Sequence, residues 1–370
     1  MHAIERKIET IFGYLAEDPP EGLLIFNRDR VDKNFIYLTE LDNGVFENCG
    51  VFAERNGKVT IFTSALEEEA ARAAGGWAEI TVFKNEQERV EKLKNALSRF
   101  GSVGVCFSAL SHSFYLVLVQ TLPHVGWTDA GRALKRARMI KREEEIEKIR
   151  KACGIASRVA DGIPGLLREG MTELELSAEI DYRLRKEGAQ GPAFKTIAAF
   201  SKNTSMPHYG GGQARLSNGD VVLVDFGAEY RGYSSDITQT YITGSPDRKL
   251  VDLYTTVYKA EGRAIDMIGE GVSVEEVDRE VRALFDAREE YRGRFIHSLG
   301  HSLGLDVHDD SYPSEDFDKR FAANMVLTVE PGIYLPGLYG VRLEDDVLVT
   351  KNGCKALTSA KKEFQAYEIH

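Results

Sequence analysis

The chain has 370 residues, which exceeds the size at which one hydrophobic core usually stops growing, so we expect two domains. Its 43% hydrophobic and 28% charged residues are typical of a globular protein. The formal net charge of −11 excludes a general nucleic-acid binder, which needs a dense basic surface, and it favours a small molecule or a peptide as the partner.

The sequence predicts a cytoplasmic protein with no membrane association. No apolar stretch approaches the roughly 20 residues of a membrane span. Residues 1–15 have the pattern of an amphipathic helix, not of a signal peptide. The four cysteines, at positions 49, 106, 153 and 354, are far apart and show no CxxC spacing, so we expect buried thiols in a reducing compartment.

Residues 1–138 alternate helical stretches with short apolar runs, which predicts an α/β domain. The runs interpreted as strands are residues 22–26, 35–39, 58–64 and 103–107. No cluster of acidic residues or histidines occurs in this part, so we expect it to serve access or assembly. A second domain, 139–370, begins near Met139 with a helix that places Ile146 and Ile149 on one apolar face.

The second domain partly repeats itself, since residues 169–184 resemble residues 270–285. Each copy opens with a predicted capping box, Thr172 with Glu175 and Ser273 with Glu276. The repeat predicts two structural halves related by pseudo-symmetry, with a site between them. The alternative is that capped amphipathic helices simply look alike.

Four predicted strands of the second domain each carry one acidic residue inside an apolar run. They are residues 220–230 with Asp225, 233–243 with Asp236, 324–334 with Glu330, and 340–350 with Glu344. An ionised carboxylate in such a place costs several kcal/mol unless it is paired or binds a metal. A salt bridge could explain any one of them, but four together indicate a shared cation.

Residues 295–310, "FIHSLGHSLGLDVHDD", contain three histidines. His297 and His301 have the spacing of the HExxH zinc helix, but Ser298 stands where that motif requires Glu, and Gly300 and Gly304 oppose a helix. The zinc-helix interpretation therefore fails. An oxygen-rich set with one imidazole suits Mn, Co, Fe or Zn at two adjacent positions.

The chain resembles the "pita-bread" metallopeptidases, the family of prolidase, aminopeptidase P and methionine aminopeptidase. The resemblance covers roughly residues 140–360 and depends on five blocks in the family's order: "VDFG", "SDIT", "HSLGHSLGLDVHD", "TVEPGIY" and "RLEDD". The preceding segment resembles the N-terminal domain of creatinases and prolidases. The implied fold is an α/β N-terminal domain followed by an α+β pita-bread catalytic domain with internal pseudo-two-fold symmetry.

The resemblance also implies the site. The implied metal ligands are Asp225, Asp236, His301, Glu330 and Glu344. They would hold two divalent ions, with Mn or Co favoured and Zn or Fe as alternatives: Asp225, Asp236 and Glu344 at one ion, and Asp236, His301, Glu330 and Glu344 at the other. The implied catalytic histidines are His208, His297 and His308, and the supporting residues are Arg342 and Tyr334.

The expected reaction is hydrolysis of a Xaa-Pro bond in a peptide with a free amino terminus. A metal-bridging hydroxide would attack, and Glu330 would act as general base. His208 and His308 would hold the carbonyl and its oxyanion, while His297 orients neighbouring groups. For each histidine, a loop hydrogen bond is the structural alternative. We expect a Xaa-Pro dipeptidase that is a homodimer; the alternatives are an aminopeptidase P acting on longer peptides, a creatinase-like hydrolase without metal and a non-catalytic peptide-binding module.

Three residues depart from the family's pattern. They are Gln239 where Arg is usual, Ser302 where Gly or an aromatic is common, and Tyr209 where His or Gly is frequent. None is an implied ligand, so these departures bear on substrate preference more than on activity. Asp309 and Asp310 are interpreted as loop carboxylates.

Overall fold

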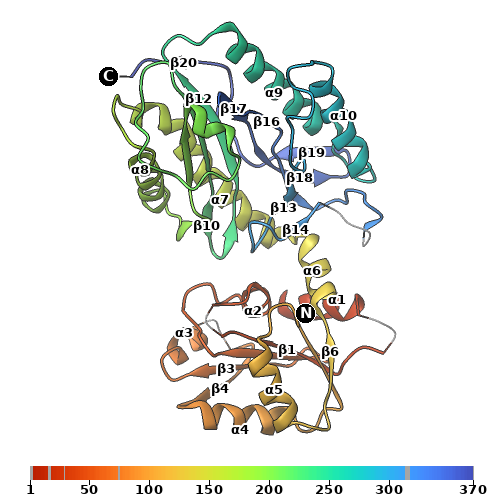
Figure 1. Cartoon of the computed structure of the whole chain (residues 1–370). Helices are drawn as coiled ribbons and strands as arrows, with labels where there is room; N and C mark the ends of the chain where they lie inside the picture. The colour runs from red at the N-terminus through yellow and green to blue at the C-terminus, as the bar shows by residue number, and fades with distance from the viewer. Residues whose placement is uncertain (1–2, 16–17, 29, 74–75, 313–316, 370) are drawn as a thin grey trace. The chain divides into compact units, whose positions relative to one another are not determined.

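The computed structural model describes residues 3–15, 18–28, 30–73, 76–312 and 317–369. The chain forms two compact units, Met1–Arg138 and Met139–His370 (Figure 1), and each is described by itself. No helix in the described ranges has both the length and the apolar character that crossing a bilayer requires.

The first unit is built on one mixed sheet, in the order β4-β3-β2-β1-β5-β6. Its strands are β1 (Gly22–Phe26), β2 (Gly50–Glu54), β3 (Val59–Ser64), β4 (Glu79–Phe83), β5 (Ser102–Val105) and β6 (Gly126–Asp129). Its helices are α1 (Ala3–Gly13), α2 (Lys33–Thr39), α3 (Glu68–Ala73), α4 (Glu86–Leu97), α5 (His112–Thr121) and α6 (Gly131–Met139). The α/β class predicted for this unit is confirmed.

One predicted strand of this unit is wrong, because residues 35–39 lie in helix α2. Asp32 caps this helix by accepting a hydrogen bond from the Asn34 N–H, and Glu40 ends it in the left-handed conformation. Phe35 and Leu38, three residues apart, are both buried. A five-residue apolar run does not distinguish a strand from a buried helix, and here the cap determined the outcome.

The first half of the second unit pairs two helices with a four-stranded sheet. The helical elements are α7 (Glu143–Gly162), the 3-10 turn η1 (Ile163–Leu166), α8 (Glu173–Lys186) and the 3-10 turn η2 (Ser201–Ser205). The sheet has the order β20-β12-β9-β8, with β8 (Ile197–Phe200), β9 (Val221–Phe226), β12 (Ile237–Thr243) and β20 (Ala366–Tyr367). A small sheet adds β7 (Gly191–Pro192), β10 (Ala228–Tyr230) and β11 (Tyr233–Ser234).

The second half repeats this plan with helices α9 (Arg248–Met267) and α10 (Val274–Asp286), which pack side by side (Figure 1). Its five-stranded sheet has the order β14-β13-β15-β18-β19. The strands are β13 (His301–Ser302), β14 (Asp310–Ser311), β15 (Val326–Val329), β18 (Asp345–Thr350) and β19 (Gly353–Ala356), and β16 (Gly332–Leu335) pairs with β17 (Tyr339–Arg342). Each half thus places a helix pair beside a sheet whose central strands are antiparallel.

The two predicted capping boxes have different outcomes. At α8 the box forms, since the Glu175 N–H donates to Thr172 Oγ1 and the Thr172 N–H donates to the Glu175 carboxylate. At α10 the Ser273 side chain makes no cap bond. The Val274 N–H there donates to the Lys319 carbonyl, so a neighbouring segment replaces the cap.

Candidate active site

The four predicted carboxylates lie where the two central hairpins begin or end, and only Asp225 lies inside a strand, β9. Asp236 directly precedes β12, Glu330 directly follows β15, and Glu344 lies between β17 and β18. The expectation that all four lie within strands is therefore wrong for three of them. Antiparallel pairing of β9 with β12 and of β15 with β18 nevertheless brings each pair to one place.

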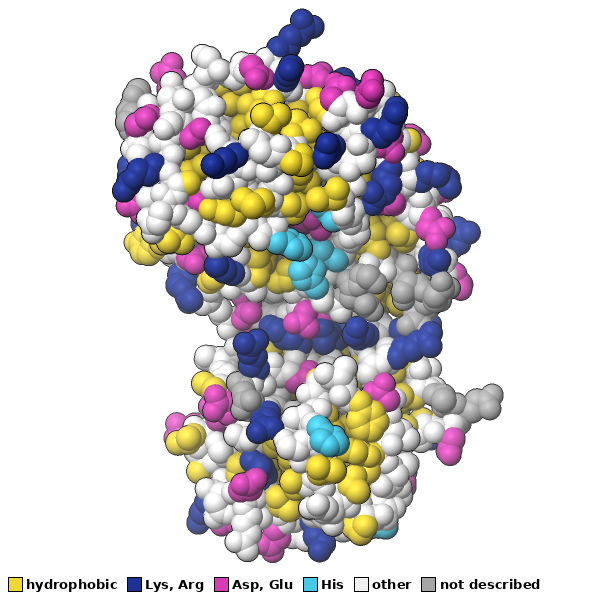
Figure 2. Space-filling view, in the orientation of Figure 1, with side chains coloured by type: hydrophobic (Ala, Val, Ile, Leu, Met, Phe, Trp, Pro, Cys, Tyr) yellow, Lys and Arg dark blue, Asp and Glu magenta, His cyan; other side chains and the backbone are white. Residues whose placement is uncertain are grey.

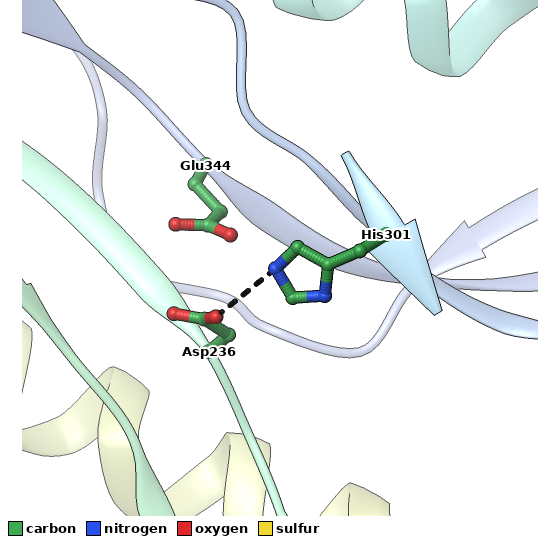
Figure 3. Close-up of side chains that lie close together, drawn as sticks. All are labelled: Asp236, His301 and Glu344. Atoms are coloured by element: carbon green, nitrogen blue, oxygen red, sulfur yellow. Dashed lines mark ion pairs between the residues drawn. The ribbon is translucent and has the colours of Figure 1, made fainter. Parts of the chain in front are cut away.

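Three of the predicted ligands form a compact group, in which one ligand atom each of Asp236, His301 and Glu344 lies within 4.8 Å of the others. Figure 3 shows the His301 ring and the two carboxylates converging from three different segments of the chain. His301 Nε2 lies 3.5 Å from Asp236 Oδ2 and 3.5 Å from Glu330 Oε1. Residues far apart in the sequence thus share one small volume.

His301 is oriented so that one ring nitrogen is available for a ligand. Its Nδ1 donates to the Ser302 carbonyl at 3.2 Å, so the lone pair is on Nε2, toward the carboxylates. Its backbone N–H donates to Thr328 Oγ1 at 3.0 Å, which fixes the strand beneath the ring. Burial, followed by the nearby His308, lowers the pKa of His301 to about 4, so the ring is neutral at pH 7 and competent to bind a metal.

The carboxylates of this site are buried and in part unpaired. Asp225 Oδ1, Asp236 Oδ1 and Glu344 Oε1 are buried and have no hydrogen-bond partner among the residues that the structure describes. Burial, reinforced by the neighbouring acidic groups, raises the pKa of Asp236 and of Glu344 well above the usual range, and burial raises that of Glu330 to about 8. Such a set is costly for the protein alone and fits divalent cations, which would neutralise it and ligate the free oxygens.

Arg342 connects the acidic groups to the rest of the site. Its guanidinium donates to Asp225 Oδ2 at 2.6 Å, to Thr238 Oγ1 at 3.0 Å and to Tyr334 Oη at 2.9 Å. Thr238 in turn donates to Glu344 Oε2 at 2.6 Å. Thr238 was missed in the sequence, although its position two residues after Asp236, on the same strand face, was a usable signal.

A second layer lies behind Asp236. The carboxylate of Asp346 accepts from the Asp236 N–H at 2.9 Å and from the Cys153 thiol at 3.2 Å. Burial raises the pKa of Asp346 to about 8 and also raises that of Cys153. Neither residue was predicted to take part, because nothing in the sequence relates α7 to β18.

The site opens into a cavity of about 780 Å³. The three predicted catalytic histidines, His208, His297 and His308, line it, and Figure 2 shows His side chains gathered on this unit. His297 Nε2 accepts from Tyr334 Oη at 2.9 Å, so Arg342, Tyr334 and His297 form one chain of hydrogen bonds. Burial, with Arg342 as the next cause, lowers the pKa of His297 to about 4.

His308 stacks edge-on against His301, with ring centroids 4.2 Å apart. The structure thus brings the predicted ligands, the histidines and Arg342 to one cavity, with Tyr334 bonded to His297 and Arg342 behind its wall, while the roles assigned to them stay predictions. Asp309 lies in the loop between β13 and β14, as interpreted, where it is buried and lies 3.7 Å from the buried Lys141 Nζ. The loop interpretation is wrong for Asp310, which begins strand β14.

Gly300 is required by close packing. A Cβ there would lie 2.2 Å from the Thr328 carbonyl oxygen, so only glycine lets this segment approach β15. The three departures, Gln239, Ser302 and Tyr209, are not among the described residues that line the cavity. Gln239 is buried in β12, where its Nε2 has no partner within the described ranges, and Ser302 is buried in β13.

Comparison with known proteins agrees with the two units. Residues 147–351 match the model of metallopeptidase family M24, and residues 8–140 match the creatinase/prolidase N-terminal domain. The chain is 31% identical to a Xaa-Pro dipeptidase of Pyrococcus horikoshii, over 98% of this chain and 100% of that protein. It is 36% identical to a Xaa-Pro dipeptidase of Pyrococcus furiosus, over 83% and 86%. The crystal structure of a Thermotoga maritima X-Pro aminopeptidase superposes with a TM-score of 0.87 at 29% identity, covering 95% of this chain and 98% of that one.

Proposed function

The chain belongs to metallopeptidase family M24, and on that basis we propose that it is a prolidase, an exopeptidase that cleaves Xaa-Pro dipeptides. Its creatinase-type N-terminal domain and pita-bread catalytic domain are those of prolidases. The observation that carries the proposal is the group of buried carboxylates with unpaired oxygens beside a neutral imidazole, in a chain similar over its whole length to Xaa-Pro dipeptidases.

The metal ligands we propose are Asp225, Asp236, His301, Glu330 and Glu344. Divalent ions held there would supply Lewis acidity, which activates water and polarises a carbonyl near neutral pH. Mn or Co is our preferred occupant, with Zn or Fe as alternatives, because oxygen ligands with one imidazole admit all four.

The chain's own side chains would handle protons and orientation. Glu330 is at the cavity wall, where its ionised carboxylate would take a proton from the attacking water and return it to the leaving nitrogen. His208 and His308 would donate hydrogen bonds to the scissile carbonyl and its developing oxyanion. His297, held between Tyr334 and the Ser298 carbonyl, would orient the substrate side.

The imide nitrogen of proline explains why a dedicated site is needed. It has no N–H, and its ring fixes φ, so peptidases that bind an extended backbone by hydrogen bonds handle it poorly. The X-Pro aminopeptidase among the similar structures keeps a second candidate open, namely cleavage after the first residue of longer peptides. Product analysis separates the two: a dipeptidase releases proline from Xaa-Pro and leaves Xaa-Pro-Yaa-Zaa intact, whereas an aminopeptidase P cleaves the tetrapeptide.

Further properties are proposed with this function. The four cysteines are free thiols, which suits a cytoplasmic location. A homodimer is expected, with the first unit serving access or assembly. Light scattering would give the mass of the particle in solution directly. A non-catalytic peptide-binding role is the remaining alternative, and elemental analysis showing no bound metal after loading would favour it.

A further inference from the structure

We propose that Glu173 and Tyr209 are a positioning pair for the reaction: together they order the segment that carries His208 and thereby set where its imidazole stands in the cavity. The inference rests on the proposed function, because it concerns the placement of a proposed catalytic histidine. Neither residue of the pair lines the cavity.

Glu173 is the first residue of α8, and its side chain is fully buried. Its Oε1 accepts from the Phe200 N–H and from Asn203 Nδ2, both at 2.8 Å. Its Oε2 accepts from Tyr209 Oη at 2.8 Å, and Asn203 Nδ2 also donates to the same Tyr209 Oη at 3.0 Å. A buried carboxylate is tolerated when hydrogen bonds replace its hydration, and these three donors do so.

The donors come from both sides of His208 in the sequence. Asn203 belongs to η2, which precedes it, and Tyr209 follows it directly. One carboxylate therefore ties together the two flanks of a short segment. His208 itself is exposed and lines the cavity, so its place is determined by its neighbours.

The downstream part of the segment is held by the same helix. The N–H of Leu174, in the first turn of α8, donates to the Gly212 carbonyl at 3.2 Å, and Lys195 Nζ donates to the Gly210 carbonyl at 2.7 Å. A Cβ at Gly212 would lie 2.5 Å from Tyr209 Oη, so the glycine leaves the space that the hydroxyl occupies. The backbone is thus fitted to a tyrosine at this position.

The pair matters because the segment continues into a stretch of backbone with little rigidity of its own. Residues 210–212 are three consecutive glycines, which fix the backbone least of all residue types. Displacement of a catalytic group by about 1 Å can cost about 100-fold in rate, so the ordering of this segment has a kinetic consequence.

The test is a double-mutant cycle on the full-length, metal-loaded protein with a Xaa-Pro dipeptide. Tyr209→Phe removes only the hydroxyl and should lower kcat/KM by about three- to tenfold, the usual effect of one hydrogen bond. In a His208→Ala background the same change should have no further effect, because the group that it positions is gone. Tyr182→Phe, on the exposed face of α8, is the matched control and should leave activity unchanged.

Hydrogen exchange of residues 206–214, with metal content measured on each variant, provides a readout that does not depend on activity. Exchange should be faster in Tyr209→Phe than in wild type or Tyr182→Phe, with equal metal content. An equal loss of kcat/KM in both backgrounds, or unchanged exchange, would overturn the inference. A wild type that cleaves no Xaa-Pro dipeptide would contradict the proposed function instead, and the exchange comparison would then decide on the pair alone.

Discussion

Replacing Arg342 by methionine should lower both the stability of the second unit and its affinity for metal. The guanidinium is buried and donates to Asp225, Thr238 and Tyr334. Methionine has a similar length but no donor, so the Asp225 carboxylate would lose its cationic partner. Removing one partner of a buried ion pair costs about 3–5 kcal/mol.

That loss converts into a large thermal shift. For a unit of 150–250 residues, about 1 kcal/mol corresponds to about 2–4 °C, so the melting temperature should fall by about 6–20 °C. Metal affinity should fall about 10- to 100-fold, as is usual when a residue that orients a metal ligand is lost. Calorimetry of the metal-free protein and a metal titration measure the two effects.

The matched control is Arg263→Met. Arg263 is half exposed and lies 3.2 Å from Glu280, a surface pair whose loss should cost about 1 kcal/mol or less. If Arg342→Met melted like this control and bound metal like wild type, the guanidinium would not support the ligand set.

Three further changes test the site and the fold. Glu330→Gln keeps the shape but cannot take a proton, so kcat should fall about 10²- to 10⁴-fold in steady-state assays; near wild-type turnover would remove Glu330 from the general-base role. Burial raises the pKa of Glu330 to about 8 and that of Asp236 and Glu344 above the usual range, so folding of the metal-free protein favours the protonated forms. Its melting temperature should therefore fall as pH rises from about 6.5 to 8.5, a range that lies above the titration of His301. Added Mn²⁺ should remove this trend. A flat profile without metal would contradict the burial argument. Gln239→Met removes a buried, unpaired amide and should raise the free energy of unfolding by about 1 kcal/mol in urea titrations at unchanged kcat, whereas a loss of stability would show that the amide has a partner.

The acidic residues of the site were predictable from the sequence because a charged residue stands out inside an apolar run that is expected to be buried. An apolar run interrupted by Asp225 or Glu344 has few inexpensive explanations, and antiparallel pairing of β9 with β12 and of β15 with β18 brings these residues together. The exact strand ends were not predictable, because they depend on which backbone groups find partners after the halves have packed.

One overlooked local signal and several long-range partners account for the rest of the misses. The helix at residues 33–39 depended on a cap at Asp32, a local signal that the apolar run obscured. The absent cap at Ser273 depended on a carbonyl at Lys319, 46 residues away, and the hydrogen bond from Cys153 to Asp346 spans 193 residues. Sequence patterns report local preference, and contacts of this kind exist only in the assembled fold.

The central claim is that the buried carboxylates and His301 hold metal for cleavage of the Xaa-Pro bond. The most direct measurement is the release of free proline from a Xaa-Pro dipeptide by the metal-loaded protein, by the same protein after chelation, and after metal is restored. The account predicts release, loss and recovery in that order. No release from any Xaa-Pro peptide with Mn²⁺ or Co²⁺, or full release after complete removal of the metal, would contradict it.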